Sequence, residues 1–313
     1  MGLSIGVDIG GTKIAAGVVD EDGTIVAEEK VETPAQDPAA LAAAVGEAIV
    51  RLRKDHDVQT VGIGAAGFVD KARATVLFAP NISWHHEPLA ARVREIVDVR
   101  VIVENDANAA AWGEFRFGAG ADVDDLLLVT VGTGVGGGIV QDGSLNRGGF
   151  GVAGEIGHLR MVRAGIRCGC GQYGCWEQYA SGRALVREAQ DRIRVGMKDA
   201  APLAAMVDGD PERITGPMVT QAAQEGDPLA CELIADVGQW LGEGIASLVA
   251  VLDPQVVAIG GGVAAAGELL MAPLRSSFWR ALPAGPDRPP TGLRFATLGN
   301  KAGMIGAADL ARV

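Results

Sequence analysis

The sequence has no apolar run that approaches the roughly 20 residues needed to cross a bilayer. Its amino terminus also lacks the basic region and apolar stretch of a signal peptide. Positive charge is scarce, because 27 Lys and Arg stand against 39 Asp and Glu and the formal net charge is −12. Such a surface repels phosphate backbones and anionic lipids. We therefore expect a cytoplasmic protein that binds neither membranes nor nucleic acid.

Cysteine is also rare, with four residues, but Cys168, Cys170 and Cys175 lie close together after His158. In a reducing compartment this crowding favours a metal over a disulfide, and a redox role is weaker because no Cys-x-x-Cys is present. Zinc prefers four tetrahedral nitrogen and sulfur ligands. We predict a structural Zn²⁺ held by these four side chains. The alternative is three unrelated buried thiols, and we expect Cys231 to be a plain core residue.

Glycine, in contrast, is abundant, and its 45 residues fall in short groups. Such groups mark places where the backbone turns with positive φ or approaches a ligand closely. Between them, hydrophobic periodicity predicts the secondary structure. The expected strands are 3–9, 14–19, 24–31, 61–65, 99–103, 126–131, 138–140 and 256–259, and the expected helical segments start at Pro38 or span 89–97, 229–252 and 302–311.

The order strand, Gly turn, strand, Asp-Gly turn occurs first over residues 3–24 and again over residues 126–143. Two hairpins can resemble each other by chance, but the matched Gly-Thr and Asp-Gly positions favour duplication. Two related lobes that each open with a Gly-turned hairpin indicate an α/β, two-lobed actin-like (ribonuclease-H-like) ATPase fold with a cleft between the lobes. We expect a small lobe of residues 1–108 plus 300–313 and a large lobe of residues 109–299 that carries the zinc loop.

The first candidate phosphate-binding turn follows the strand at 3–9. Phosphate needs several donors in a concave patch, and the N–H groups of Gly10 and Gly11 are not shielded by Cβ atoms. The Thr12 hydroxyl adds a donor, and Asp8 can hold a hydrated Mg²⁺. No Walker A pattern is present, and an ordinary tight hairpin is the alternative. Lys13 either steers phosphate or is a solvated strand residue, and the second reading is slightly favoured.

Two further glycine turns strengthen the phosphate interpretation. The segment 132–134 contains Thr133 and Gly134 and ends the strand 126–131. A third turn, made by Gly260, Gly261 and Gly262, follows the buried strand 256–259. One Gly-Gly-Thr turn alone is weak evidence, but three such turns together favour a nucleotide site.

Carboxylate and amide side chains near the ends of predicted elements are candidates for hydrogen-bonding to sugar hydroxyls. Asn105 and Asp106 end a strand, where α/β folds present functional groups. Asn105 or Asp106 can instead be a helix N-cap, and the glutamates can be solvated surface charges. A zinc loop would help to fix the nearby glutamates in place. The full set of sugar-site candidates is Asn81, Asn105, Asp106, Glu155, His158 and Glu177.

These motifs resemble the ROK family (repressors, open reading frames and sugar kinases). The resemblance rests on residues 126–158, with 134–139, Gly148 and 154–158, on the zinc motif 168–177 and on the phosphate motif 8–13, and it covers essentially the whole chain. Within the family the chain is most similar to bacterial, actinobacterial-type, glucokinases.

The resemblance implies ATP-dependent phosphorylation of glucose at O6, with Asp106 as the base that takes the O6 proton. It implies that Asn81, Asn105, Glu155, His158 and Glu177 hold the sugar. It further implies that the phosphate turns, including Lys13 and Gly134, bind ATP, that 260–262 lie near the adenosine, and that Asp8 positions Mg²⁺.

Other readings stay open. N-acetylmannosamine, N-acetylglucosamine and fructose are alternative substrates, because the 155–158 motif is shared among several kinases of the family. A sugar-sensing regulator is the rival of another class, but no room for a helix-turn-helix domain is expected ahead of Asp8, and the net charge argues against DNA. We expect a homodimer or homotetramer.

Overall fold

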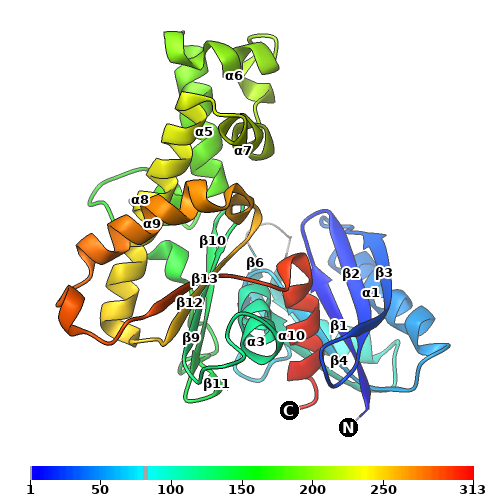
Figure 1. The fold of residues 1–313 in the computed structure, drawn as a ribbon. Helices are drawn as coiled ribbons and strands as arrows, with labels where there is room; N and C mark the ends of the chain where they lie inside the picture. Colours follow the sequence, from blue (N-terminus) through cyan, green and yellow to red (C-terminus); the bar gives the residue numbers. More distant parts are fainter. Residues whose placement is uncertain (1, 80–83) are drawn as a thin grey trace. The chain divides into compact units, whose positions relative to one another are not determined.

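The computed structural model describes residues 2–79 and 84–313. Contact density divides the chain into two compact units: the first comprises 1–128, 137–155 and 296–313, and the second comprises 129–136 and 156–295 (Figure 1). The strands are β1 (Leu3–Ile9), β2 (Lys13–Val19), β3 (Ile25–Glu32), β4 (Val58–Ala65), β5 (Phe68–Val69), β6 (Val76–Ala79), β7 (Trp84–Glu87), β8 (Arg100–Asn105), β9 (Leu126–Val131), β10 (Val135–Gln141), β11 (Ser144–Leu145), β12 (Val256–Gly260) and β13 (Gly292–Phe295). The α-helices are α1 (Pro38–Arg53), α2 (Leu89–Arg94), α3 (Asp106–Phe117), α4 (Glu177–Ala180), α5 (Gly182–Arg194), α6 (Ala201–Met206), α7 (Gly216–Gln224), α8 (Pro228–Leu252), α9 (Glu268–Ala281) and α10 (Ala302–Leu310).

The first unit is built on a five-stranded sheet of order β3-β2-β1-β4-β8. β1 runs antiparallel to β2 and parallel to β4, and β4 runs parallel to β8. Because side chains alternate along a strand, Ile5, Val7 and Ile9 of β1 lie in one buried cluster with Leu41 and Val45 of α1. α1 therefore covers this face of the sheet.

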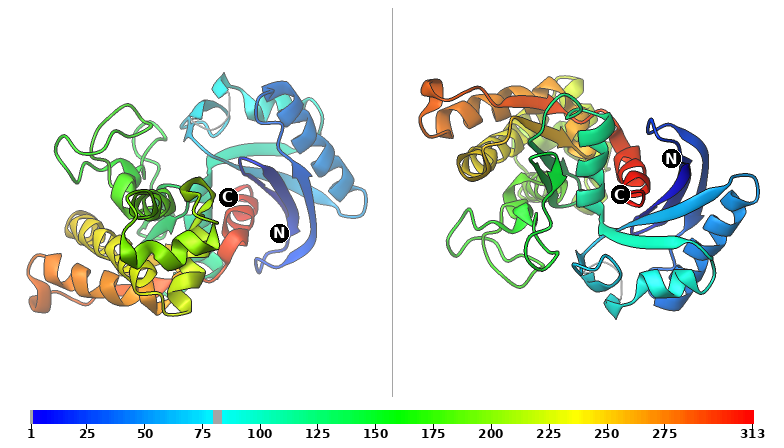
Figure 2. Two further views of the ribbon diagram at one scale, coloured as in Figure 1. Left: turned by 90° about the horizontal axis from the view of Figure 1, so that it is seen from above. Right: turned by 90° about the horizontal axis from the view of Figure 1, so that it is seen from below.

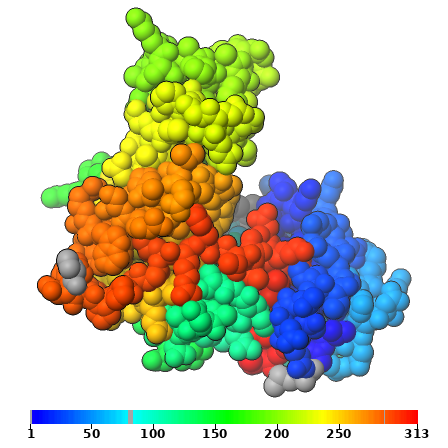
Figure 3. Space-filling model, in the orientation of Figure 1, coloured from blue at the N-terminus to red at the C-terminus, as the bar shows by residue number. Residues whose placement is uncertain are grey.

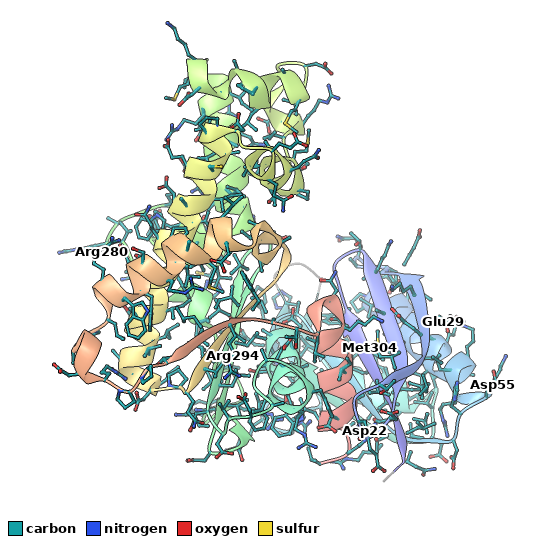
Figure 4. All side chains as sticks on the ribbon, in the orientation of Figure 1. Asp22, Glu29, Asp55, Arg280, Arg294 and Met304 are labelled. Carbon is teal, nitrogen blue, oxygen red and sulfur yellow. The ribbon has the colours of Figure 1, made fainter. Side chains whose placement is uncertain are left out.

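The opposite face of the same sheet is shaped by a row of glycines. Gly6 pairs with Gly17 on β2 and with Gly62 on β4. A β-carbon on Gly6 would lie 1.8 Å from the carbonyl oxygen of Met304, and one on Gly62 would meet α10 equally closely. The missing side chains thus let the backbone of α10 lie directly on the sheet, and Figure 4 labels Met304 at this contact.

α3 packs along α10 in the same unit. Gly113 and Gly306 allow this, because a β-carbon on Gly306 would lie 1.8 Å from the carbonyl oxygen of Ala109. Two views from opposite ends show α10 between α3 and the sheet (Figure 2). A small three-stranded sheet, β5-β6-β7, completes this unit.

The second unit contains β12 and β13, which pair in parallel, and the long helices α8 and α9. α8 and α9 pack closely because β-carbons on Gly238 and Gly242 would meet backbone atoms of α9. The helices α5, α6 and α7 form a projection of this unit, in green and yellow-green in Figure 3. In the described residues, 2–79 and 84–313, no helix combines the length and the hydropathy that a membrane span requires.

The predicted α/β class is confirmed, and the internal repeat has a structural counterpart. β9 and β10 contribute to a second sheet of order β11-β10-β9-β12-β13. If the five strands of each sheet are numbered from one to five in chain order, both sheets have the strand order 3-2-1-4-5. This equal order is what a duplicated half predicts.

The compact units have other boundaries than the two lobes expected from the sequence. The expected lobe boundaries stay a prediction. Residues 109–128 and 137–155 lie in the first unit. The physical reason is packing: α3 lies against α10, and a β-carbon on Gly138 of β10 would lie 2.4 Å from the Ala111 side chain. Predicted elements shift by a few residues at most, as where α2 ends at Arg94 rather than at 97.

Candidate functional site

The carboxyl edge of the first sheet brings two predicted acidic residues to one end of parallel strands. Ile9 pairs with Ala65, and Ala65 pairs with Asn105, so these three residues are level across β1, β4 and β8. Asp8 directly precedes Ile9, and Asp106 directly follows Asn105. The carboxyl edge is where open α/β sheets bind their ligands.

Asn105 ends β8 and is also the N-cap of α3. Its Oδ1 accepts a hydrogen bond from the Asn108 N–H at 3.0 Å, and its Nδ2 donates to the Gly67 carbonyl oxygen at 3.1 Å. The N-cap alternative is thus correct for Asn105. One hydrogen of Nδ2 is left for a ligand, so capping and sugar binding are compatible.

Asp106 is the first residue of α3, where the helix dipole favours negative charge. The Ala107 N–H donates to its Oδ1 at 2.9 Å. Nevertheless burial raises the pKa of the Asp106 carboxyl above its ordinary value, because desolvation outweighs the hydrogen bonds from the Ala107 and Asp106 N–H groups. A carboxylate whose pKa is raised is a stronger proton acceptor than a solvated aspartate, as a general base requires.

Asp8 has the same tendency. Burial, and then the negative charge of Asp106, raise the pKa of Asp8 to about 6. Gly303 in the first turn of α10 lies against it, since a β-carbon there would be 3.4 Å from the Asp8 Cγ. Two carboxyl groups that repel each other in a poorly hydrated place will bind a cation or a proton.

The first glycine turn joins β1 to β2 at this edge. The Gly10 N–H donates to the Lys13 carbonyl oxygen at 3.0 Å, which leaves Gly11 and Thr12 exposed at the tip. Lys13 is exposed and stands opposite Glu32 in the β2–β3 register. This pairing agrees with the solvated-strand interpretation of Lys13.

In the second unit the other two glycine turns lie together. The Gly132 N–H donates to the Gly134 carbonyl oxygen at 3.0 Å, so this turn closes on the residue two positions on, whereas the Gly10 turn closes on the residue three positions on. Gly261 has φ of 87°, and a β-carbon on it would lie 2.5 Å from the Val131 carbonyl oxygen. The Gly182 N–H, at the start of α5, donates to the Gly132 carbonyl oxygen at 2.8 Å. The three segments therefore meet at the end of β9.

A cavity of about 490 Å³ opens beside these turns. Its volume lies in the range usual for small-ligand sites. Arg183 is the one charged residue of this lining, counted over the described part of the chain. The residues that line it are Gly132, Thr133, Gly182, Arg183, Leu185, Val186, Gly216, Pro217, Thr220, Gly262 and Val263.

Sequence reasoning missed the α5 and α7 residues of this cavity. The segment of Gly182 and Arg183 follows the N-cap Ser181, and Gly216 and Pro217 follow the N-cap Thr215. Two capped helix starts with glycine are a recognisable signal. Their convergence on residue 132 is tertiary information, and the sequence pattern alone does not contain it.

The predicted metal ligands form one cluster. One ligand atom from each of His158, Cys168, Cys170 and Cys175 can be chosen so that all four lie within 4.8 Å of one another. Cys168 Sγ lies 3.7 Å from His158 Nδ1, and Cys170 Sγ lies 3.6 Å from Cys175 Sγ. Tetrahedral zinc with Zn–S bonds near 2.3 Å requires sulfur atoms about 3.8 Å apart. The donor set and its spacing therefore fit a closed zinc site.

Glu177, the first residue of α4, contacts this cluster. Cys168 Sγ lies 3.1 Å from Glu177 Oε1, and His158 Nδ1 lies 3.9 Å from the same oxygen. A β-carbon on Gly134 would lie 2.5 Å from Glu177 Oε2. Glu177 thus joins the metal cluster to the second glycine turn.

The remaining predicted residues are placed as follows. Glu155 is exposed in the first unit, two residues after Ala153 and directly after Gly154. The side chain of His158 is 35% exposed. Asn81 lies outside the described residues. Cys231, on α8, donates through its Sγ to the Ala223 carbonyl oxygen and takes no part in the metal cluster.

Comparison with known proteins adds independent evidence. The ROK family profile matches residues 4–313. Over 312 residues the chain is 51% identical to a glucokinase of Streptomyces coelicolor, covering 100% of this chain and 98% of that protein. It is 35% identical over 264 residues to an N-acetylmannosamine kinase of Yersinia pseudotuberculosis, covering 84% of each.

A solved structure extends the likeness to three dimensions. The crystal structure of a ROK family glucokinase from Streptomyces griseus, in complex with glucose and AMPPNP, matches with a TM-score of 0.90 at 53% identity and covers 99% of each chain. With two sheets of equal order and a profile match over nearly its whole length, this chain belongs to the ROK family and has the family's two-lobed actin-like α/β fold.

Proposed function

We propose that this chain is a glucokinase that transfers the γ-phosphoryl group of ATP to the O6 hydroxyl of glucose. The observation that carries the proposal is Asp106, a buried carboxyl with a raised pKa at the start of α3. Glucose is favoured over other sugars by the 51% and 53% identities to two Streptomyces glucokinases, one of them crystallised with glucose and AMPPNP.

Asp106 acts as the general base. Phosphoryl transfer passes through a loose transition state, so positioning and charge stabilisation matter more than strong nucleophile activation. Asp106 Oδ accepts the proton of the O6 hydroxyl as the new bond to phosphorus forms. Because the pKa of Asp106 is raised, the carboxylate is a better proton acceptor than a solvated aspartate.

ATP binds in the cavity of the second unit. Leu185, Val186 and Pro217 give it the apolar wall that a purine ring needs, and Arg183 supplies positive charge for the phosphates. The turns that contain Thr133 and Gly10–Thr12 donate backbone N–H groups to phosphate oxygens. Mg²⁺ that arrives with ATP would neutralise phosphate charge, with Asp8 as its protein carboxylate.

Sugar hydroxyls are held by Asn105, Glu155, His158 and Glu177, together with Asn81. The His158, Cys168, Cys170 and Cys175 set holds a structural Zn²⁺. Its role would be to fix the loop that ends at Cys175, and so to hold Glu177, which follows two residues later, in place. The protein acts in the cytoplasm as a homodimer or homotetramer.

The proposal is tested by ADP release measured against glucose, fructose, N-acetylglucosamine and N-acetylmannosamine. We expect the highest kcat/KM with glucose. A clear preference for N-acetylmannosamine would instead favour a function like that of the Yersinia relative. Sugar binding without any sugar-dependent ADP release would indicate a sensing role.

A further inference from the structure

Glu104, two residues before Asp106, is a carboxylate that the mechanism above does not use. It lies on β8 and is 2% exposed. A buried carboxylate is expensive unless it is paired and hydrogen-bonded. Its partners therefore indicate what it holds in place.

One oxygen of Glu104 holds the start of the helix that carries Asp106. The Asn105 N–H donates to Oε1 at 3.1 Å, and the Asn108 Nδ2 donates to the same atom at 3.2 Å. Asn105 caps α3 through the Asn108 N–H. Asp106 thus lies in the chain between Asn105 and Asn108, which both donate a hydrogen bond to Glu104 Oε1.

The other oxygen holds a different segment. Arg147 Nε donates to Glu104 Oε2 at 2.6 Å, and Arg73 Nε lies 3.6 Å from it as an ion pair. Arg147 begins the segment 147–155, which ends at Glu155. The Ala153 N–H donates to the Arg147 carbonyl oxygen at 3.2 Å, so this segment folds back on the residue that Glu104 holds.

The far end of the same segment also lies against α3. A β-carbon on Gly154, which has φ of 94°, would be 3.4 Å from Asn108 Oδ1 and 3.1 Å from the Gly137 carbonyl oxygen. Asn108 is 1% exposed. The residue directly before Glu155 is thus in close contact with the asparagine that Glu104 binds.

We propose that Glu104 is a positioning residue that couples the alignment of Asp106 to the segment carrying Glu155, with Oε1 fixing α3 and Oε2 fixing Arg147. The proposal rests on the proposed function, in which both carboxylates serve the sugar. It predicts that the sugar side of the reaction depends on Glu104 while the nucleotide cavity, built from the second unit, does not.

Glu104→Gln is the informative change because an amide has one oxygen and one NH₂ group. If the new NH₂ group faces Arg147, the charged hydrogen bond from Arg147 is lost. If it faces α3, the NH₂ group meets the Asn105 N–H and the Asn108 Nδ2, which are also donors, and both of those hydrogen bonds are lost. One of the two links breaks in either orientation. We expect kcat to fall and the glucose KM to rise by about 10-fold each or more, while the dissociation constant of AMPPNP changes less than 2-fold.

Asp309→Asn is the matched control. Asp309 is 4% exposed in the same unit and binds Trp112 and Arg116 in the second half of α3, and Arg312 after α10. We expect it to lower Tm to a comparable degree and to leave kcat and the glucose KM within 2-fold. Arg147→Met carries the same prediction as Glu104→Gln should that variant fail to fold, and Arg147→Lys should restore part of the loss.

Three results would overturn the proposal. The first is that the kinetics of Glu104→Gln or Arg147→Met match those of Asp309→Asn, and the second is that AMPPNP binding weakens as much as glucose binding. The third is that the losses in Glu104→Gln and Arg147→Met simply add in the double variant. Non-additive losses support a shared link. Failure of the proposed function is recognised separately, because the wild-type protein would then show no sugar-dependent ADP release.

Discussion

Glu177 Oε1 lies 3.1 Å from Cys168 Sγ, so a carboxylate proposed to bind sugar touches one of the four candidate zinc ligands. The same carboxylate occupies the space beside Gly134, since a β-carbon there would lie 2.5 Å from Oε2 and would have to displace it. The metal loop and the second glycine turn are therefore joined through one residue. A structural metal that fixes this loop would therefore also fix Glu177, which follows the candidate ligand Cys175 by two residues.

Metal removal should consequently weaken glucose binding more than nucleotide binding. Cys175→Ser, or treatment with a strong chelator, should remove one zinc per chain, lower Tm by at least about 5 °C, and raise the glucose KM several-fold. Elemental analysis and calorimetry measure these effects. Cys231→Ser is the control and should retain zinc. Full activity in a zinc-free sample would contradict the role of the loop.

Gly134→Ala tests the same contact from the other side. The added methyl group must displace the Glu177 carboxylate, and we expect kcat/KM for glucose to fall by about 10-fold or more, equivalent to about 1.4 kcal/mol. In Glu177→Ala the clash is absent, so adding Gly134→Ala to that variant should have little further effect. Independent, additive losses would show that Gly134 acts in another way.

Arg183 should matter for ATP and not for glucose. It is the one charged side chain among the described residues lining the cavity proposed to bind the nucleotide. Arg183→Ala should raise the ATP KM about 10-fold, because a charged hydrogen bond to phosphate contributes about 1.5–3 kcal/mol, and adenosine binding should be unchanged. Arg192→Gln serves as control, because Arg192 lies on the same helix, pairs with Glu232 and does not line the cavity. Equal weakening of adenosine and ATP would place Arg183 at the base rather than at the phosphates.

The raised pKa of Asp8 predicts a conflict between stability and function. A carboxyl whose folded pKa lies above its unfolded value destabilises the protein once it is ionised, so this destabilisation develops as pH rises from about 4 to about 6. Asp8→Asn should therefore stabilise the ligand-free protein at pH 8 by up to about 3 kcal/mol while lowering kcat. Thermal unfolding from pH 4 to pH 8 would show the difference vanishing on the acid side. A variant that is less stable at pH 8 would refute this account of Asp8.

The sequence was sufficient for the parts of the fold that depend on local pattern. β1 and α8 have strong periodicity, and both lie where they are predicted. The clustering of His158, Cys168, Cys170 and Cys175 could also be predicted, because three of the four are close in sequence. The packing of α10 on the glycine row at Gly6, Gly17 and Gly62 could not, since each glycine alone also fits a turn or a bulge.

The site shows the same division. The place of Asp106 after a strand could be predicted, but the capping role of Asn105 depends on where α3 starts, and the sequence left that open. The coupling through Glu104 was not predicted at all, because its partner Arg147 is distant in sequence and only the fold brings the two together.

The central claim is that the carboxylate of Asp106 takes the proton from a bound glucose hydroxyl. The most direct measurement is a single-turnover assay of phosphoryl transfer from ATP to glucose by wild-type protein and Asp106→Asn, with glucose affinity determined in parallel. The account predicts a transfer rate lowered by at least about 10³-fold with glucose affinity changed only a few-fold. Transfer at a near wild-type rate in Asp106→Asn would contradict it.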